Sequence, residues 1–259
     1  MPAQLAGILH LLWLPASSFF AGVLNAVAGG GSFLSLPALI AAAAGTGVGA
    51  VAAQATNTVA LYPGQITGLI AFRKKIAAYG WGALPISIAA GLGGWLGGFL
   101  LLRTPNHQFK LLLPWLILFG SLMFVISIPL GDWLSRRSGG KRYGRCLLFG
   151  MFAVSVYVGY FGAGGGFLVM ALFGLCGITD IHEINALKIL TAFVSLGIPT
   201  IHFILAGRVQ WRFCVEMAIL AAIGGYLAAH LSPKINPNVM RWTVAAIGML
   251  TAVYFFVQS

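Results

Sequence analysis

The chain consists of long apolar runs that carry almost no charge. Residues 1–72 contain no Asp, Glu, Lys or Arg, and only 7% of the 259 residues are charged. A soluble domain has about 25% charged residues, so this chain could not cover a surface that faces water. A soluble enzyme and a soluble nucleic-acid-binding domain are therefore excluded, and the high hydrophobicity excludes disorder. We predict an all-α, polytopic helical membrane protein.

The apolar runs predict about 8 to 10 membrane segments, since a spanning helix takes about 20 apolar residues. Two runs, 32–45 and 165–177, are short and reach roughly 20 Å at about 1.5 Å per residue. Each lies at a glycine triplet, Gly29–Gly31 or Gly164–Gly166, so we predict a broken helix followed by a short half-helix. The runs cover residues 5–28, 32–45, 47–72, 77–102, 109–130, 146–161, 165–177, 184–206, 211–231 and 239–257.

The net charge of +11 comes mostly from basic residues that lie between the apolar runs. This placement is typical of orientation by cytoplasmic positive charge and of contact with anionic membrane lipid, so no nucleic-acid partner is expected. The longest polar stretch, 132–145, predicts a cytoplasmic linker between a first transmembrane repeat, 1–131, and a second, 146–259. The first apolar run has no basic n-region, so it is expected to belong to the mature protein rather than to a signal peptide.

The two halves resemble each other in sequence. Residues 28–34 (AGGGSFL) align with residues 163–169 (AGGGFLV), and GGWL at 93–96 aligns with GGYL at 224–227. Weak internal symmetry of this kind is typical of secondary transporters. Counting basic residues on each side does not separate parallel repeats from inverted ones. We favour inverted repeats, because residues 5–45 are too long for a single crossing and the uncharged N-terminus has nothing to hold it inside.

Each glycine triplet has two interpretations. One is close helix packing through small residues, which we prefer for the glycine-rich run 91–98. The other, preferred for the triplets, is a helix break whose new N-terminus carries partial positive charge and binds an anion through backbone N–H groups. The predicted anion-binding amides belong to Gly30, Gly31, Ser32, Gly165, Gly166 and Phe167. Neither GxGxxG nor a P-loop is present, so nucleotide binding is not supported.

Polar side chains in the apolar helices are the next candidates, since such groups usually face the protein interior or a cavity. Asn57, Thr58 and Asn185 could donate hydrogen bonds to the substrate, or could bond neighbouring helices. Lys188 could add positive charge to the site, or could extend to the membrane surface. Asp180 or Glu183 is expected to cap a helix, and His202 is interpreted as a packing residue rather than a proton carrier. The three cysteines lie far apart and no ligand cluster is complete, so neither a metal nor another cofactor is expected.

These motifs together resemble the TauE/SafE sulfite exporter family. The first half carries NAVAGGG at 25–31, LPAL at 36–39 and Thr56-Asn57. The second half carries YFGAGGG at 160–166, NALK at 185–188 and GRVQW at 207–211. The resemblance implies a multi-pass carrier of the cell inner membrane that moves sulfur-containing anions through a central site at the breaks and the Asn-containing helices. The first half has Thr58 and no lysine after Asn57, so the half-sites differ and the particular anion stays open.

We therefore expect a secondary transporter and not an enzyme. It would bind sulfite, an organosulfonate or a related oxyanion between the two helix breaks and work by alternating access. A proton or a sodium ion would be the coupling ion, and the sequence does not indicate an oligomeric state. The main alternative is an anion channel that uses the same half-helix site.

Overall fold

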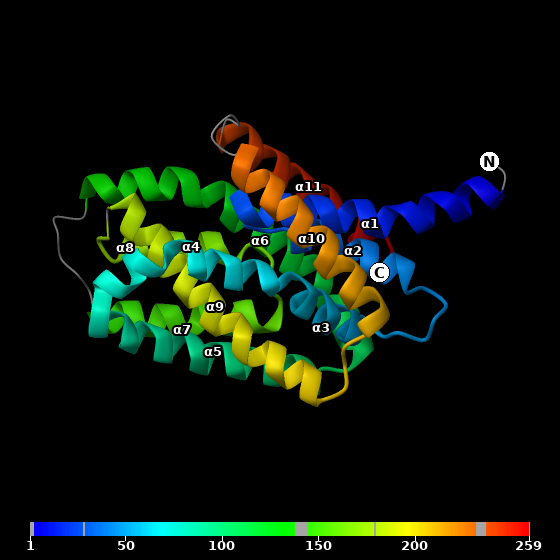
Figure 1. Ribbon diagram of the computed structural model, residues 1–259, viewed down its shortest axis with the longest axis horizontal. Coiled ribbons are helices and arrows are strands. Elements are labelled where there is room, and N and C mark those ends of the chain that lie inside the picture. The colour runs from blue at the N-terminus through cyan, green and yellow to red at the C-terminus, as the bar shows by residue number, and fades with distance from the viewer. Residues whose placement is uncertain (1–2, 28, 138–143, 179, 232–236, 259) are drawn as a thin grey trace.

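The computed structural model describes residues 3–27, 29–137, 144–178, 180–231 and 237–258, and these ranges contain helices and no strand (Figure 1). This confirms the all-helical prediction. The first half contains α1 (Ala3–Val27), α2 (Ser32–Ala42), α3 (Ala50–Leu61), α4 (Pro63–Tyr79), the 3-10 turn η1 (Gly80–Ala83), α5 (Leu84–Arg103) and α6 (Asn106–Arg137). The second half contains α7 (Gly144–Tyr160), α8 (Gly165–Leu175), α9 (Ile181–Leu205), α10 (Trp211–Leu231) and α11 (Pro237–Gln258).

Two predicted helix boundaries were wrong, each because of a residue that alters the backbone. The run 47–72 is divided into α3 and α4 at Pro63, which has no N–H to continue the hydrogen-bond ladder. Tyr62 before it keeps helical backbone angles, with φ −64° and ψ −35°, so the backbone does not unwind between the two helices. The next helix starts at Leu84 rather than near residue 77, because Gly80 ends α4 with φ 55°.

The outer surface and the helix lengths are those of a membrane protein. Among the described residues, the segments Phe72–Arg103, Glu183–Leu205 and Trp211–Ala228 are long and apolar enough to cross a bilayer, and several shorter helices are apolar as well. Large apolar side chains are exposed on the outside, with Trp81 at 87% and Phe149 at 77% of their full exposure. A surface rich in such side chains is suited to lipid rather than to water.

The fold interleaves the two halves. Helix α1 of the first half packs along α10 of the second, and α5 of the first half packs along α7 of the second (Figure 1). Helices α6 and α11 also pack on each other. The predicted linker is partly helical, because α6 continues to Arg137 and α7 starts at Gly144, while residues 138–143 lie outside the described part.

Glycine residues allow the helices of the pairs α5–α7 and α1–α10 to approach closely. A Cβ atom on Gly93 would collide with the backbone carbonyl of Phe152 on α7, and one on Gly224 would collide with that of Phe19 on α1. The glycines are 131 residues apart and the two carbonyls are 133 apart, so nearly the same contact occurs twice in the molecule. Small residues that let helix backbones touch are typical of membrane helix packing. The packing interpretation of the run 91–98 is thus confirmed, with Gly94 and Gly98 closing on α9 in the same way.

The helix ends gather at two opposite ends of the bundle. At one end Asn106 Oδ1 accepts a hydrogen bond from the N–H of Val51 at 3.1 Å. On the adjoining part of α3, the N–H of Gln210 donates to Thr56 Oγ1 at 2.9 Å. At the opposite end, the Tyr79 hydroxyl at the end of α4 donates to the Glu183 carboxylate in the first turn of α9. Asp180 directly precedes α9 and Glu183 lies in its first turn, as expected for acids at a helix N-terminus.

Candidate functional site

The chain leaves helical geometry between α1 and α2 and again between α7 and α8. Gly29 has φ 73° and Gly30 has φ 109°, whereas Gly162 has φ 78° and Gly164 has φ 74°. Residues that carry a side chain rarely adopt this left-handed backbone conformation, so glycine is needed at these positions. The predicted helix breaks are therefore confirmed, and the anion binding predicted for them stays a prediction. In the second half α8 begins at Gly165, which is also the start of the predicted short run 165–177.

The two breaks lie against each other in the core. The tip of the Phe33 ring is 3.2 Å from the point where a Cβ of Gly164 would stand. In return, the Phe167 ring is 3.7 Å from the corresponding point of Gly29. Both rings are buried. The first turn of each half-helix thus carries a phenylalanine that packs on the glycine break of the other half, which brings the two breaks together at one place.

Backbone amides at the first break are already hydrogen-bonded. The N–H groups of Gly30 and Gly31 both donate to Asn25 Oδ1, at 3.2 and 3.0 Å. The prediction that these two amides are free for an anion is contradicted in this conformation, because Asn25 on the last turn of α1 reaches across the break and accepts both hydrogen bonds. Ser32 begins α2, and Ala28, the residue four positions before it, lies outside the described residues.

At the second break, tight turns use most of the predicted amides. The N–H of Gly165 donates to the carbonyl of Gly162 at 3.3 Å, and the N–H of Phe167 donates to that of Gly164 at 3.1 Å. These two amides are therefore also not free, since the first turn of α8 satisfies them internally. Among the described hydrogen bonds, the Gly166 N–H has no acceptor. Of the three amides predicted at this break, that of Gly166 is the one left to bind a ligand.

Lys188 lies beside Gly166. Its Cδ atom is 3.7 Å from the point where a Cβ of Gly166 would stand, and the lysine is half-buried. The stem of Lys188 on α9 therefore runs along the start of α8, with which α9 packs. A cationic side chain and a helix N-terminus favour the same kind of ligand, an anion.

Helix α3 contributes buried amide groups near both breaks. Asn57 is fully buried, and its Oδ1 accepts a hydrogen bond from Ser35 Oγ of α2 at 2.6 Å. Gln54 donates from Nε2 to the carbonyl of Phe161 at 2.6 Å, at the start of the second break. The other amide atoms, Asn57 Nδ2 and Gln54 Oε1, are buried without a described partner. A buried donor without a partner costs about 1–3 kcal/mol, so Asn57 Nδ2 is a candidate ligand donor.

The other predicted polar residues contribute less to this cluster. Thr58 Oγ1 donates to the carbonyl of Gln54 at 3.0 Å within its own helix. Thr191 and Ser195, which lie three and seven residues after Lys188 on α9, likewise bond to backbone carbonyls of α9. Asn185 is half-buried near the start of α9 and no described hydrogen bond joins it to either break. His202 lies beside Trp95, with ring centroids 6.3 Å apart, and its buried Nδ1 has no described partner.

Sequence reasoning missed the roles of Asn25, Ser35 and Gln54. All three are polar residues inside apolar helices, and that is the signal that could have identified them. Asn25 lies five positions before Gly30, close enough to reach back across the break.

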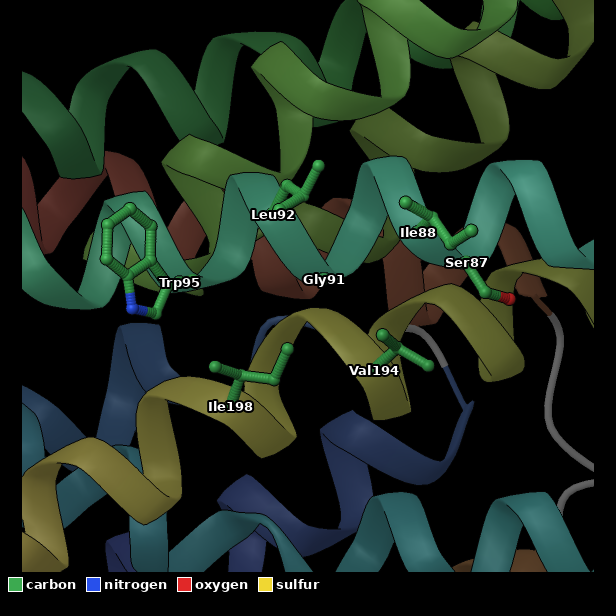
Figure 2. Close-up of a pocket in the computed structure, with 7 residues that line it drawn as sticks. All are labelled: Ser87, Ile88, Gly91, Leu92, Trp95, Val194 and Ile198. Carbon is green, nitrogen blue, oxygen red and sulfur yellow. The ribbon is translucent and has the colours of Figure 1, made fainter.

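A groove between α5 and α9 is a poor alternative site for an anion. It has a volume of about 600 Å³ and is lined by Ser87, Ile88, Gly91, Leu92, Trp95, Val194 and Ile198 (Figure 2). The labelled side chains are almost entirely apolar and carry no charge. They therefore cannot compensate the cost of removing an anion from water. Lipid chains are better suited to such a lining.

Comparison with known proteins assigns the chain to a family. The family described as Sulfite exporter TauE/SafE matches residues 14–255. The chain belongs to the TauE/SafE family. It is 30% identical to "Probable membrane transporter protein YfcA" of Escherichia coli K12 over 247 residues, which are 93% of this chain and 88% of that protein.

Two further relatives of this chain are also named as membrane transporters. A "Probable membrane transporter protein" of Haemophilus influenzae is 28% identical, covering 98% of this chain and 97% of its own. "Probable membrane transporter protein ORF9" of a Sinorhizobium species is 24% identical, covering 87% of this chain and 83% of its own. No solved structure matches the chain. As a TauE/SafE protein the chain is a membrane transporter and not an enzyme.

Proposed function

We propose that this TauE/SafE transporter moves a small sulfur-containing anion, such as sulfite, an organosulfonate or a related oxyanion. The observation that carries the proposal is the reciprocal packing of Phe33 on Gly164 and of Phe167 on Gly29. It brings the two helix breaks to one place in the core. The positive ends of two short helices then lie near the same volume, and a negative ligand is stabilised there.

Three groups are the proposed primary ligands. They are the N–H of Gly166, the side chain of Lys188 beside it, and the unpartnered Nδ2 of Asn57. An oxyanion presents several acceptor oxygens and can satisfy such donors together, which offsets part of the cost of leaving water. Ser32, Thr58 and Asn185 line the same region in the proposal, as side-chain donors. The amides of Gly30, Gly31, Gly165 and Phe167 shape the breaks by their own hydrogen bonds.

We infer transport by alternating access between inverted repeats in the inner membrane. Each half supplies a long helix, a half-helix and further helices in the same order, and an odd number of crossings per half would give the halves opposite orientations. The matched glycine contacts of α1 with α10 and of α5 with α7 support this symmetry. They join helices of both halves into two units, and rocking of one unit against the other would expose the breaks to each side in turn.

Transport by purified protein tests the substrate class. Proteoliposomes that contain the protein should accumulate radiolabelled sulfite or a sulfonate, and unlabelled members of the class should compete with it while chloride and acetate should not. Competition by every anion alike would contradict the proposal. Unitary currents in a planar bilayer would instead favour the anion channel that uses the same site.

Lys188 gives the matched test of the site itself. Lys188→Gln removes the charge and should raise the substrate KM strongly, whereas Lys188→Arg keeps the charge and should retain most transport. Lys75→Gln, at an exposed cation of α4 away from the breaks, is the control and should leave the KM unchanged. Equal KM values for Lys188→Gln and the wild type would remove Lys188 from the site.

A further inference from the structure

A polar pocket opens at one end of the bundle, where α2 stops and α3 begins. It has a volume of about 540 Å³ and is bounded by Ile40, Ala44, Ala50, Ala53 and Lys110 together with the loop between the two helices. Side chains at Gly45 and Gly47 would meet nothing within 4 Å, so this loop leaves the pocket wide. A water molecule takes about 30 Å³ of liquid. The pocket therefore has room for a small oxyanion together with many of its waters.

The charge of the pocket has one sign. Lys110 on the second turn of α6 is exposed and lines the pocket, and no acidic residue is among its lining residues. A concave site lined by charge of one sign raises the local concentration of anions. The pocket thus favours the same charge type as the proposed transport site.

The pocket and the buried Asn57 share one face of α3. Ala50, Ala53 and Asn57 follow the i, i+3, i+7 spacing that places residues on the same side of a helix. Ala53, which lines the pocket, and Asn57 are separated by about 6 Å along the helix axis. Asn57 is fully buried and its Nδ2 has no described partner, so a donor for an anion lies about one turn below the floor of the pocket.

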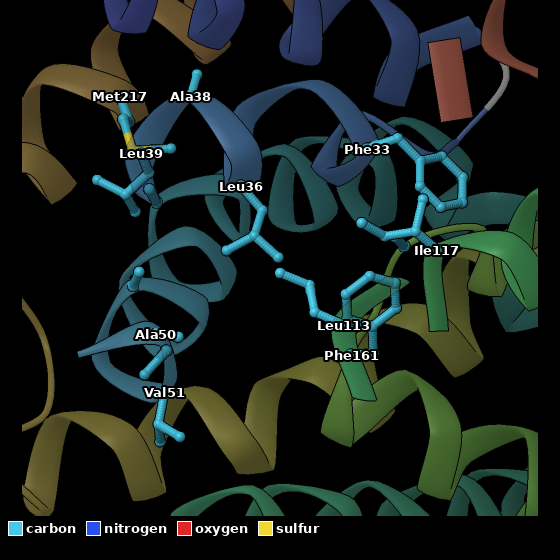
Figure 3. Packing of buried hydrophobic residues seen from close by; sticks show 14 of the residues in the cluster. Phe33, Leu36, Ala38, Leu39, Ala50, Val51, Leu113, Ile117, Phe161 and Met217 are labelled. Carbon is cyan, nitrogen blue, oxygen red and sulfur yellow. The ribbon is translucent and has the colours of Figure 1, made fainter. Parts of the chain in front are cut away.

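A layer of leucines closes this short path. Leu36 lies one turn deeper than Ile40 on α2, and Leu113 lies one turn deeper than Lys110 on α6. Both are fully buried and belong to one apolar cluster. Figure 3 shows their side chains directed toward each other beside Phe161, the residue before the second break. Leu36 and Leu113 therefore pack just below the pocket on α2 and α6, and their side chains can change rotamer.

We propose that this pocket is the vestibule in which the substrate anion is collected from water before it reaches Asn57, with Lys110 as the collecting charge. The inference rests on the proposed function and adds to it the route and the residue that captures the anion. Lys110 attracts the anion but does not hold it in the transport site. Loss of its charge should therefore change the apparent affinity and its dependence on salt, and leave kcat as it is.

The first experiment compares matched variants in proteoliposomes. Lys110→Gln should raise the KM for sulfite up to about fivefold, the range for one exposed charge pair, and should weaken the rise of KM with ionic strength. Lys110→Arg should keep the wild-type KM. Arg212→Gln, at an exposed cation of α10 that does not line the pocket, should also keep it. A KM unchanged in Lys110→Gln, with sulfite still transported, would overturn the vestibule and leave the proposed function standing.

The second experiment reads the pocket without requiring transport. Ala44→Cys is placed in a Cys146→Ser background, because Cys146 is exposed while Cys176 and Cys214 are buried. The new thiol should react faster with an anionic methanethiosulfonate than with a cationic one, and Lys110→Gln should abolish that preference. An organosulfonate, which does not react with the reagent, should slow the labelling. Equal rates for the two reagents would overturn the proposal, whatever the transport assay shows. A preference that depends on Lys110, without transport of any sulfur anion, would support the pocket and contradict only the proposed substrate class.

Discussion

Gln54 donates a hydrogen bond from Nε2 to the backbone carbonyl of Phe161, and the two atoms lie 2.6 Å apart. Gln54 lies in the middle of α3, and Phe161 is the first residue after α7, where the second break begins. One turn further along α3, Asn57 accepts a hydrogen bond from Ser35 of α2. A single buried helix is therefore bonded to the half-helix of its own half and to the break of the other half, so a movement of α3 would act on both.

Loss of the Gln54 bond should destabilise the protein. Gln54→Leu leaves the buried Phe161 carbonyl without its donor, and we expect a loss of about 1–3 kcal/mol of stability. Thermal unfolding in detergent, followed by size-exclusion chromatography, measures the change. Gln65→Leu, at a half-buried glutamine of α4, is the control and should unfold near the wild-type temperature. A Gln54→Leu protein as stable as the control would show that the bond contributes nothing.

Two substitutions of Asn25 distinguish the effect of charge at the first break from the effect of its hydrogen bonds. Asn25→Asp keeps an oxygen in reach of the Gly30 and Gly31 amides and should preserve stability, but its negative charge should repel the anion and reduce transport sharply. Asn25→Ala removes the acceptor of both amides and should lower stability by about 1 kcal/mol. Uptake assays and thermal unfolding on the same two preparations check both effects. Full transport by Asn25→Asp would show that the anion does not approach this break.

Ser35→Ala and Asn57→Ala break the same hydrogen bond but differ in the donor that remains. Ser35→Ala leaves Asn57 Nδ2 in place, whereas Asn57→Ala removes it. We expect similar losses of stability, about 1 kcal/mol each, and a much larger rise of the substrate KM for Asn57→Ala. Equal KM values in the two variants would mean that Asn57 has a purely structural role.

The glycine contacts between the halves should tolerate no side chain. Gly93→Ala and Gly224→Ala each place a methyl group on a backbone carbonyl, of Phe152 and Phe19, which cannot move as a side chain can. We expect each to cost about 1–3 kcal/mol. Gly174→Ala, where a Cβ meets nothing within 4 Å, is the matched control and should change stability by about 0.5 kcal/mol or less. The unfolding temperatures of the three variants measure these changes in stability. Wild-type stability in Gly224→Ala would mean that α1 and α10 are not in such close contact.

The sequence predicts the helices better than it predicts the donors at the site. The starts of α2 and α8 at Ser32 and Gly165 coincide with the predicted ones, because apolar length and glycine backbone freedom are local properties of the chain. The hydrogen-bond acceptor of each amide is not a local property of the chain. Gly30 and Gly31 donate to Asn25 only because the chain folds back on itself at the break.

Contacts between residues far apart in the chain could not be predicted from the sequence for the same reason. The Gln54 bond joins residues 107 positions apart, and the pocket at Lys110 forms only where α6 passes the loop between α2 and α3. Lys188 was a candidate because it is a polar residue in an apolar helix. The structure adds that its side chain lies along Gly166, which no spacing in the sequence could show.

The pairing of α1 with α10 has a consequence for biosynthesis. Helix α1 ends at Val27 and α10 starts at Trp211, so a ribosome that adds roughly 5–20 residues per second releases the second helix about 10 to 40 s after the first. During that interval the bare glycine surface of α1, around Gly22, has no permanent neighbour in the bilayer. A nascent chain truncated before α10 should therefore be a preferred target for membrane proteases, and supplying the missing C-terminal fragment in trans should protect it.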